Sequence, residues 1–231
     1  MLERLYGALA ADPLVRGVRL GGSRSRAEDD EWSDIDLVLD APGWEPTRLG
    51  GLWLGGQTMR LGAAPFYHGV LADGTILDVL IGPPGEVYHP PNVKPSPPPV
   101  AVPLAEGASL DFWLNSMKHA KPFGRGVGGV VFFGLHHDAM ALVRLWAMED
   151  TGKDPGSGAF TIFGMTPLIR NHLSPGRLRL LGMPTRDTEE LRSAARAYRE
   201  AASVAGRTGE ARWGIPYAHL LEEVVRKRWP L

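Results

Sequence analysis

The chain has 231 residues, enough for one large or two small domains. Its 25 basic and 26 acidic side chains give a formal net charge of −1, so no global field attracts nucleic acid, which counts against a processive polymerase or a tRNA-binding enzyme. The absence of cysteine excludes disulfides, thiolate catalysis and cysteine-based zinc sites. No apolar run reaches the length of a membrane span and no signal-peptide pattern begins the chain, so we expect a cytoplasmic protein without a membrane partner.

The first third of the sequence predicts a small mixed sheet with helices. Residues 2–10 carry apolar side chains at helical spacing, and residues 15–20 predict a strand that ends in a Gly-Ser turn. A second strand includes residues 36–39. Residues 43–62 are rich in glycine and fit either helix or strand. A hairpin over residues 66–81 completes the predicted sheet.

The turn and the second strand together carry the residues for a chemical reaction. Asp34 and Asp36 are two residues apart on a strand, so their side chains share a face, while Ile35 points into the core. Two carboxylates this close repel each other unless a cation lies between them, and hard oxygen ligands suit Mg²⁺. Gly22 and Ser23 offer what a phosphate needs, namely a closely approachable backbone, exposed N–H groups and a hydroxyl. Metal and phosphate together indicate phosphoryl or nucleotidyl transfer.

A third carboxylate is predicted on the returning strand of the hairpin. Asp73 is explained by turn chemistry alone, since Asp-Gly is a hairpin turn signal. Asp78 instead interrupts an apolar run that is typical of a buried strand, where an unpaired charge would be costly. A metal shared with Asp34 and Asp36 is the natural partner. The alternative is an aspartate at the sheet edge, paired with an arginine.

The composition changes after the hairpin. Residues 89–107 are rich in proline, which predicts an extended connector or a strap packed on the surface of the first domain. Residues 108–231 show helical patterns instead. The fold class is therefore α+β, with a first domain over residues 1–88 and a C-terminal helical bundle. The expected helices run from about 109 to 121, from 130 to 148 and, capped by Asp187 with Glu190, from 187 to 204, and a last helix has Pro216 in its first turn.

The signature of the nucleotidyltransferase superfamily, typified by polymerase beta, resembles two runs in this chain, Leu20-Gly21-Gly22-Ser23 and Ser33-Asp34-Ile35-Asp36-Leu37. That signature is a hydrophobic-Gly-Ser turn, a short spacer, Asp-x-Asp on a strand, and a third carboxylate on a later strand. The continuation Arg24-Ser25-Arg26 is most similar to the minimal, small-substrate branch, which includes the antibiotic nucleotidyltransferases.

The resemblance implies an enzyme that moves a nucleoside monophosphate, typically AMP from ATP, onto a hydroxyl of a small molecule. By the same resemblance the acceptor would be an antibiotic such as an aminoglycoside or a lincosamide. It implies two Mg²⁺ ions, with the triphosphate as the other substrate. The residues implied for catalysis and metal binding are Asp34, Asp36 and Asp78. The residues implied for nucleotide binding are Gly22, Ser23, Arg24 and Lys118.

Alternatives stay open at several positions. Arg24 either contacts a phosphate oxygen or braces the loop, and Lys118 either contacts the triphosphate or lies on a solvated helix face. The alternative function is an antitoxin-type adenylyltransferase that modifies a partner protein, although such enzymes are usually shorter and lack a helical domain. A degenerate nucleotide-binding module would need a broken acidic triad. If Asp78 were structural, the acceptor base would be sought at Glu149 and Asp150.

Overall fold

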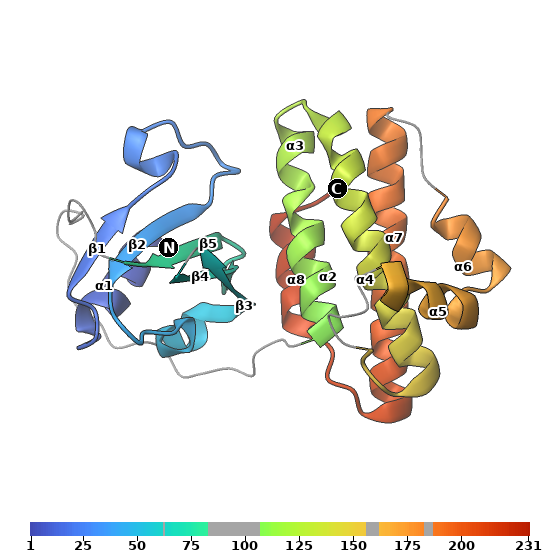
Figure 1. Cartoon of the computed structure of the whole chain (residues 1–231). Helices are drawn as coiled ribbons and strands as arrows, with labels where there is room; N and C mark the ends of the chain where they lie inside the picture. The colour runs from blue at the N-terminus through green and yellow to red at the C-terminus, as the bar shows by residue number, and fades with distance from the viewer. Residues whose placement is uncertain (62, 83–106, 156–161, 183–186) are drawn as a thin grey trace. The chain divides into compact units, whose positions relative to one another are not determined.

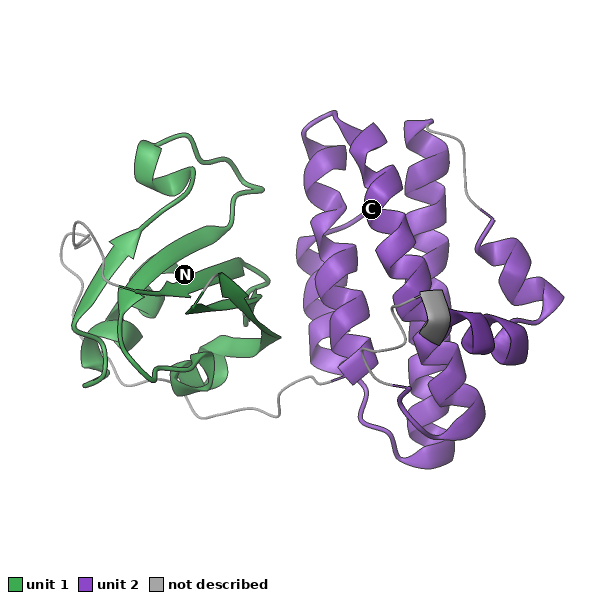
Figure 2. Cartoon of the chain, in the orientation of Figure 1, with its two compact units in different colours: residues 1–104 green, residues 105–231 purple. Residues whose placement is uncertain are grey.

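The computed structural model describes residues 1–61, 63–82, 107–155, 162–182 and 187–231 (Figure 1). The chain divides into two compact units, unit 1 over residues 1–104 and unit 2 over residues 105–231 (Figure 2). The connector expected over residues 89–107 lies outside the described residues except for Gly107, which begins the first helix of unit 2.

Unit 1 is built on one mixed sheet of five strands in the order β1-β2-β5-β4-β3. Its strands are β1 (Gly17–Leu20), β2 (Ile35–Asp40), β3 (Trp53–Leu61), β4 (Ala64–Leu71) and β5 (Ile76–Ile81). Strands β2 and β5 pair in parallel, whereas the other neighbours are antiparallel. The α+β class, the small mixed sheet and the hairpin, here β4–β5, are therefore confirmed. The ambiguous segment after β2 contains both elements, since a 3-10 helix, η2 (Pro46–Leu52), leads into β3.

One face of the sheet carries the hydrophobic core of unit 1. Along β2 the side chains alternate, with Ile35 and Leu37 buried and Asp36 partly exposed on the opposite face. The buried face belongs to the same apolar cluster as Leu5 and Leu9 of α1 (Leu2–Ala11). Burying a leucine side chain contributes about 1.5–3 kcal/mol. The core therefore fixes which face of β2 and β5 remains available for chemistry.

Unit 2 consists of helices, as predicted, but several bounds differ from the expectation. Its helices are α2 (Gly107–Lys118), α3 (Ala120–Gly124), η3 (Gly128–Val130), α4 (Val131–Thr151), α5 (Ile162–His172), α6 (Pro175–Leu180), α7 (Thr188–Trp213) and α8 (His219–Arg228). Asp187 caps α7, because its Oδ1 accepts hydrogen bonds from the N–H groups of Glu189 and Glu190. Helices α5 and α6 were not expected, and Pro167 inside α5 weakens its helical pattern.

The last helix begins later than predicted. Pro216 precedes α8 instead of lying in its first turn. The reason is Tyr217, whose side chain is drawn into the core. Its hydroxyl accepts from Trp113 Nε1 at 2.9 Å and donates to Glu222 Oε2 at 2.9 Å, which holds the chain before α8 out of the helix.

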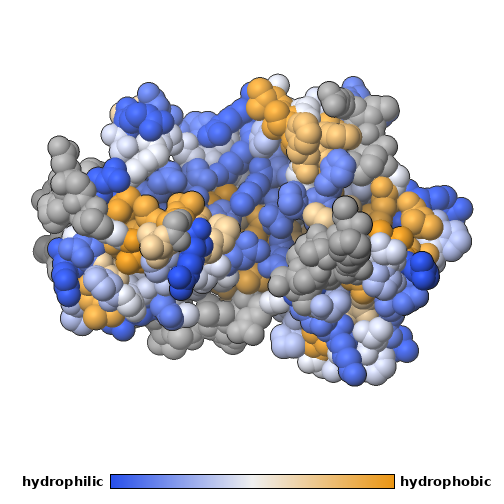
Figure 3. Space-filling model, viewed as in Figure 1, coloured by the Kyte–Doolittle hydropathy of each residue, from blue (hydrophilic) through white to orange (hydrophobic). Residues whose placement is uncertain are grey.

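A buried arginine ties the helices of unit 2 together. Arg199 on α7 is 4% exposed and donates to the hydroxyl and the carbonyl of Ser116 on α2 and to the carbonyl of Trp229 after α8. Burial lowers the pKa of Arg199 to about 10, so its guanidinium stays charged at neutral pH. Among the helices that the structure describes, none has the length and apolarity of a membrane span. Hydrophilic and hydrophobic residues are interspersed over the visible face of both units (Figure 3).

Candidate functional site

A row of polar residues crosses the sheet of unit 1 on the face opposite the core. Asp36 on β2 is the direct partner of Asp78 on β5, and Asp78 is in turn the partner of His68 on β4. Gln57 on β3 continues the row as the partner of His68. Neighbouring strands lie about 4.8 Å apart, and residues in register share a face. The sheet therefore brings together two of the three predicted carboxylates.

The Gly-Ser turn joins this row at its β1 end. The N–H of Gly21 donates to the carbonyl of Asp36 at 2.7 Å, which extends the pairing of β1 with β2 into the turn. Asp34 lies one residue before β2 and is partly buried. The Gly-Ser turn, which follows β1, therefore lies beside Asp36 on the neighbouring strand β2.

Gly22 is in direct contact with the Asp36 side chain. A Cβ atom at Gly22 would lie 1.8 Å from Asp36 Oδ2 and 2.7 Å from Asp36 Cγ, distances at which no side chain fits. The backbone of Gly22 also has φ +62°, in the left-handed region that glycine adopts most readily. Glycine is therefore required twice at this position, once for the turn and once for the close approach of the carboxylate.

Replacing Gly22 with alanine is expected to lower the free energy of unfolding by more than backbone strain alone would lower it, because the added Cβ also clashes with Asp36. Gly43→Ala is the matched control, because Gly43 has φ +76° and nothing within 4 Å of an added Cβ. A residue strained in this way costs on the order of 1–3 kcal/mol. Urea unfolding of both variants measures the difference, and equal losses would show that Asp36 does not press against Gly22.

Arg24 braces the loop between the turn and β2. Its Nε donates to the carbonyl of Asp34 at 2.9 Å, its Nη2 donates to the carbonyl of Ser33 at 3.1 Å, and its Nη1 pairs with Asp29 at 2.9 Å. Through these contacts Arg24 braces the loop, which is one of the two roles that the sequence leaves open. They hold Asp34 and the turn in a fixed relation, and the role of Arg24 in nucleotide binding stays a prediction.

Ser23 starts the short 3-10 helix η1 (Arg24–Arg26). Its carbonyl accepts from the N–H groups of Arg26 and Glu28 at 3.0 and 3.1 Å. Its hydroxyl makes no capping hydrogen bond to this helix. The backbone of Ser23 therefore shapes the turn without using the hydroxyl as a cap.

The surroundings of Asp78 do not match the alternative of an aspartate at the sheet edge that pairs with an arginine. β5 is the middle strand of the five, so Asp78 is not at a sheet edge. Among the described residues its side-chain partner is His68, whose Nδ1 contacts Asp78 Oδ1, and not an arginine. The sequence reasoning missed His68. A signal existed, because a hairpin centred on Asp73 places residue 68 opposite residue 78.

The donor set matches a hard cation in its chemistry. Asp34, Asp36 and Asp78 offer carboxylate oxygens, the ligands that Mg²⁺ prefers, and the register places Asp36 beside Asp78. The contact of Asp36 with Gly22 puts this pair against the Gly-Ser turn. Within the described ranges, no group of three or more His, Asp or Glu side chains is arranged to hold a metal ion as it stands.

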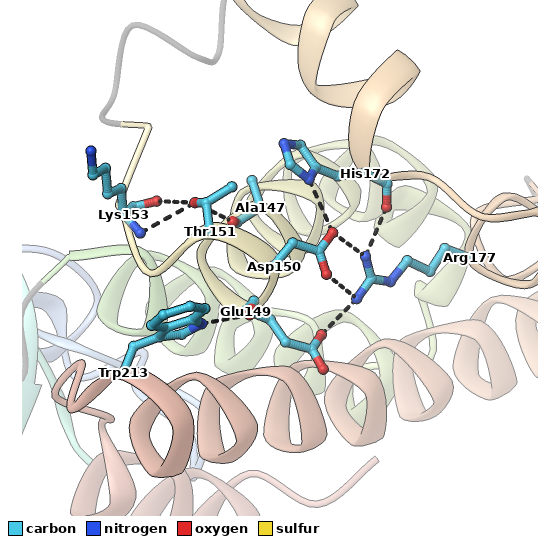
Figure 4. A network of polar contacts seen from close by, with 8 residues as sticks. All are labelled: Ala147, Glu149, Asp150, Thr151, Lys153, His172, Arg177 and Trp213. Carbon is cyan, nitrogen blue, oxygen red and sulfur yellow. Dashed lines mark hydrogen bonds and ion pairs between the residues drawn. The ribbon is translucent and has the colours of Figure 1, made fainter.

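The other predicted residues lie in unit 2. Lys118 is exposed near the end of α2. Glu149 and Asp150, at the end of α4, both pair with Arg177, at 2.7 and 2.9 Å (Figure 4). His172 Nδ1 also lies 3.0 Å from Asp150. These carboxylates therefore tie α4 to the segment around α6.

The two carboxylates of this network differ in acidity. Burial raises the pKa of Glu149, and Arg177 only partly offsets this effect. Burial also opposes ionisation of Asp150, but hydrogen bonds from Arg177 and His172 bring its pKa below the ordinary value. The contacts in Figure 4 give both Glu149 and Asp150 a structural role, which is to hold the end of α4 against Arg177.

Comparison with known proteins finds similarity to solved structures but no sequence match. No family model matches the sequence, and no curated protein matches it. A solved structure with a similar fold is that of an aminoglycoside 6-adenyltransferase from Bacillus subtilis, with a TM-score of 0.41 and 12% identity. The alignment covers 99% of this chain and 95% of that chain. A similarity this weak does not assign an activity.

Proposed function

We propose that this protein is a magnesium-dependent nucleotidyltransferase that moves a nucleoside monophosphate onto a hydroxyl group. The observation that carries the proposal is the contact of Gly22 with the carboxylate of Asp36, a residue that lies in register with Asp78 on the neighbouring strand. A turn suited to phosphate and a carboxylate pair suited to a cation thus meet at one edge of the row. Phosphoryl chemistry needs both of these parts.

We assign the residues the following roles in this proposal. Asp34, Asp36 and Asp78 would hold the magnesium ions. Ions held there would supply neutralisation of charge on the α-phosphate and a lower pKa of the acceptor hydroxyl. Gly22 and the hydroxyl of Ser23 hold the β- and γ-phosphates, and Arg24 keeps the turn in place against Asp34.

The reaction is a single displacement at phosphorus. The acceptor oxygen attacks the α-phosphate, and the bond from the α-phosphorus to the bridging oxygen breaks, so that pyrophosphate leaves. Asp78 takes the proton of the acceptor hydroxyl as general base. The nucleotide proposed is ATP, and the acceptor proposed is a small hydroxylated molecule of the aminoglycoside or lincosamide kind. Lys118 is proposed to contact the triphosphate.

A panel of small hydroxylated molecules, incubated with α-labelled nucleotides and Mg²⁺, tests the proposal. We expect label transfer to at least one acceptor, with release of pyrophosphate in equal amount. Label that appears on a protein instead would favour the antitoxin-type adenylyltransferase. Hydrolysis or binding without any transfer across the panel, with chelator as the negative control, would argue against a nucleotidyltransferase.

Ser23→Ala is expected to raise the apparent KM for the nucleotide while metal binding changes little. One hydrogen bond to a charged group contributes about 1.5–3 kcal/mol, so a rise of roughly tenfold to a hundredfold is expected. Initial rates at varied nucleotide concentration measure the effect. Ser193→Ala on the exposed side of α7 is the matched control. An unchanged KM for every nucleotide tested would count against the phosphate-binding turn.

A further inference from the structure

The position of His68 in the sheet leaves one of its ring nitrogens buried, without a hydrogen bond to any residue that the structure describes. It is 5% exposed on β4, between Phe66 and Val70 on the same face of the strand. Its Nε2 atom is buried and has no hydrogen-bond partner among the described residues. A buried polar atom left without a partner costs about 1–3 kcal/mol. An apolar side chain would fill this position without that cost, so packing alone does not explain a histidine.

What the imidazole provides is its contact with Asp78. Nδ1 of His68 meets Oδ1 of Asp78 from the adjacent strand. β5 lies between β4 and β2, so His68 approaches Asp78 from the side opposite to Asp36. A carboxylate held at one oxygen from the β4 side keeps its other oxygen for the β2 side, where the rest of the proposed site lies.

We infer that His68 is a positioning residue, which fixes the orientation of the Asp78 carboxylate for the transfer reaction. This inference rests on the proposed function. Carboxylates that bind metal are themselves held by hydrogen bonds, and loss of such a partner typically lowers metal affinity or activity 10- to 100-fold. His68 does not act as the base itself, because its remaining nitrogen, Nε2, is buried.

Two substitutions distinguish positioning from space filling. Asparagine can place an amide nitrogen where Nδ1 of His68 lies, whereas glutamine places its amide near Nε2. We expect His68→Gln and His68→Leu to lower kcat about 10- to 100-fold with nucleotide KM nearly unchanged. His68→Asn is expected to restore kcat to within about threefold of the wild type. Rates are referred to folded protein, from melting curves of each variant.

Binding of Mn²⁺ alone, by titration, gives a second readout that does not need an acceptor. The affinity for Mn²⁺ is expected to fall about 10- to 100-fold in the glutamine and leucine variants and to recover in the asparagine variant. Transfer by the wild type with equal kcat in all three variants would overturn the role of His68 and leave the proposed function standing. The expected Mn²⁺ pattern without transfer to any acceptor would overturn the proposed function while supporting the positioning of Asp78 by His68 for cation binding. Glutamine performing as well as asparagine in both assays would also overturn it.

Discussion

Asp36→Asn is expected to remove nearly all nucleotidyl transfer while the fold stays intact. Asparagine has the shape of aspartate, so its contact with Gly22 is kept, but the charge that would hold the cation is lost. We expect kcat to fall by several orders of magnitude. The melting temperature without metal should hold or rise, because a like charge beside Asp78 has been removed. Labelled-nucleotide transfer and a melting curve on one sample measure both effects.

Asp40→Asn is the matched control for this variant. Asp40 lies on the same strand and the same face as Asp36. Four residues of strand place it roughly 13 Å further along, too far for the same cation. We expect wild-type activity from this control. Activity of Asp36→Asn within tenfold of the wild type would exclude Asp36 as a metal ligand.

Asp78→Asn is expected to separate nucleotide binding from the chemical step. The variant should bind MgATP about as well as the wild type, because Gly22 and Ser23 are unchanged. Its kcat should fall by several orders of magnitude, since the proposed base is gone. An asparagine oxygen can still accept from Nδ1 of His68, so we expect only a small loss of stability. Nucleotide titration, rates and melting on the same sample give the three quantities.

The control for Asp78→Asn is the same change in the turn of the same hairpin. Asp73 Oδ1 accepts from the N–H of Thr75 at 3.0 Å, a bond that asparagine can also make. Asp73→Asn should therefore behave as the wild type. A variant of Asp78 that loses stability but keeps its rate per folded molecule would show that the contact with His68 is structural and that Asp78 is not a third metal ligand.

The parts of the site that the sequence predicts are those set by local patterns. The two-residue alternation of β2 places Asp36 on the face opposite the core, and the Asp-Gly turn predicts the hairpin that returns with Asp78. The contact of Gly22 with Asp36 is different, because it depends on how closely the turn folds back on β2. No spacing in the sequence states that distance.

Helix α7 shows how tertiary packing overrides a local signal. The sequence predicts its end near Val204. Gly206 and Gly209, which follow, are residues that disfavour a helix. The helix continues to Trp213 instead. A Cβ at Gly206 would lie 2.2 Å from the ring of Tyr217, so this glycine makes room for a core side chain from beyond the helix. The need for glycine there comes from packing that the sequence pattern does not contain.

The parallel pairing of β2 with β5 also sets the order in which the molecule can assemble. Pairing β3 with β4 and β4 with β5 joins neighbours in the chain, whereas joining Asp36 to Asp78 closes a loop of about 40 residues. The entropy of that closure must be overcome before the pair forms, and long-range pairing is slow. We therefore expect a refolding chain to form its hairpins first and its carboxylate pair when the sheet closes. The cation binding proposed for this pair would therefore recover only after that closure, once the local strands have formed.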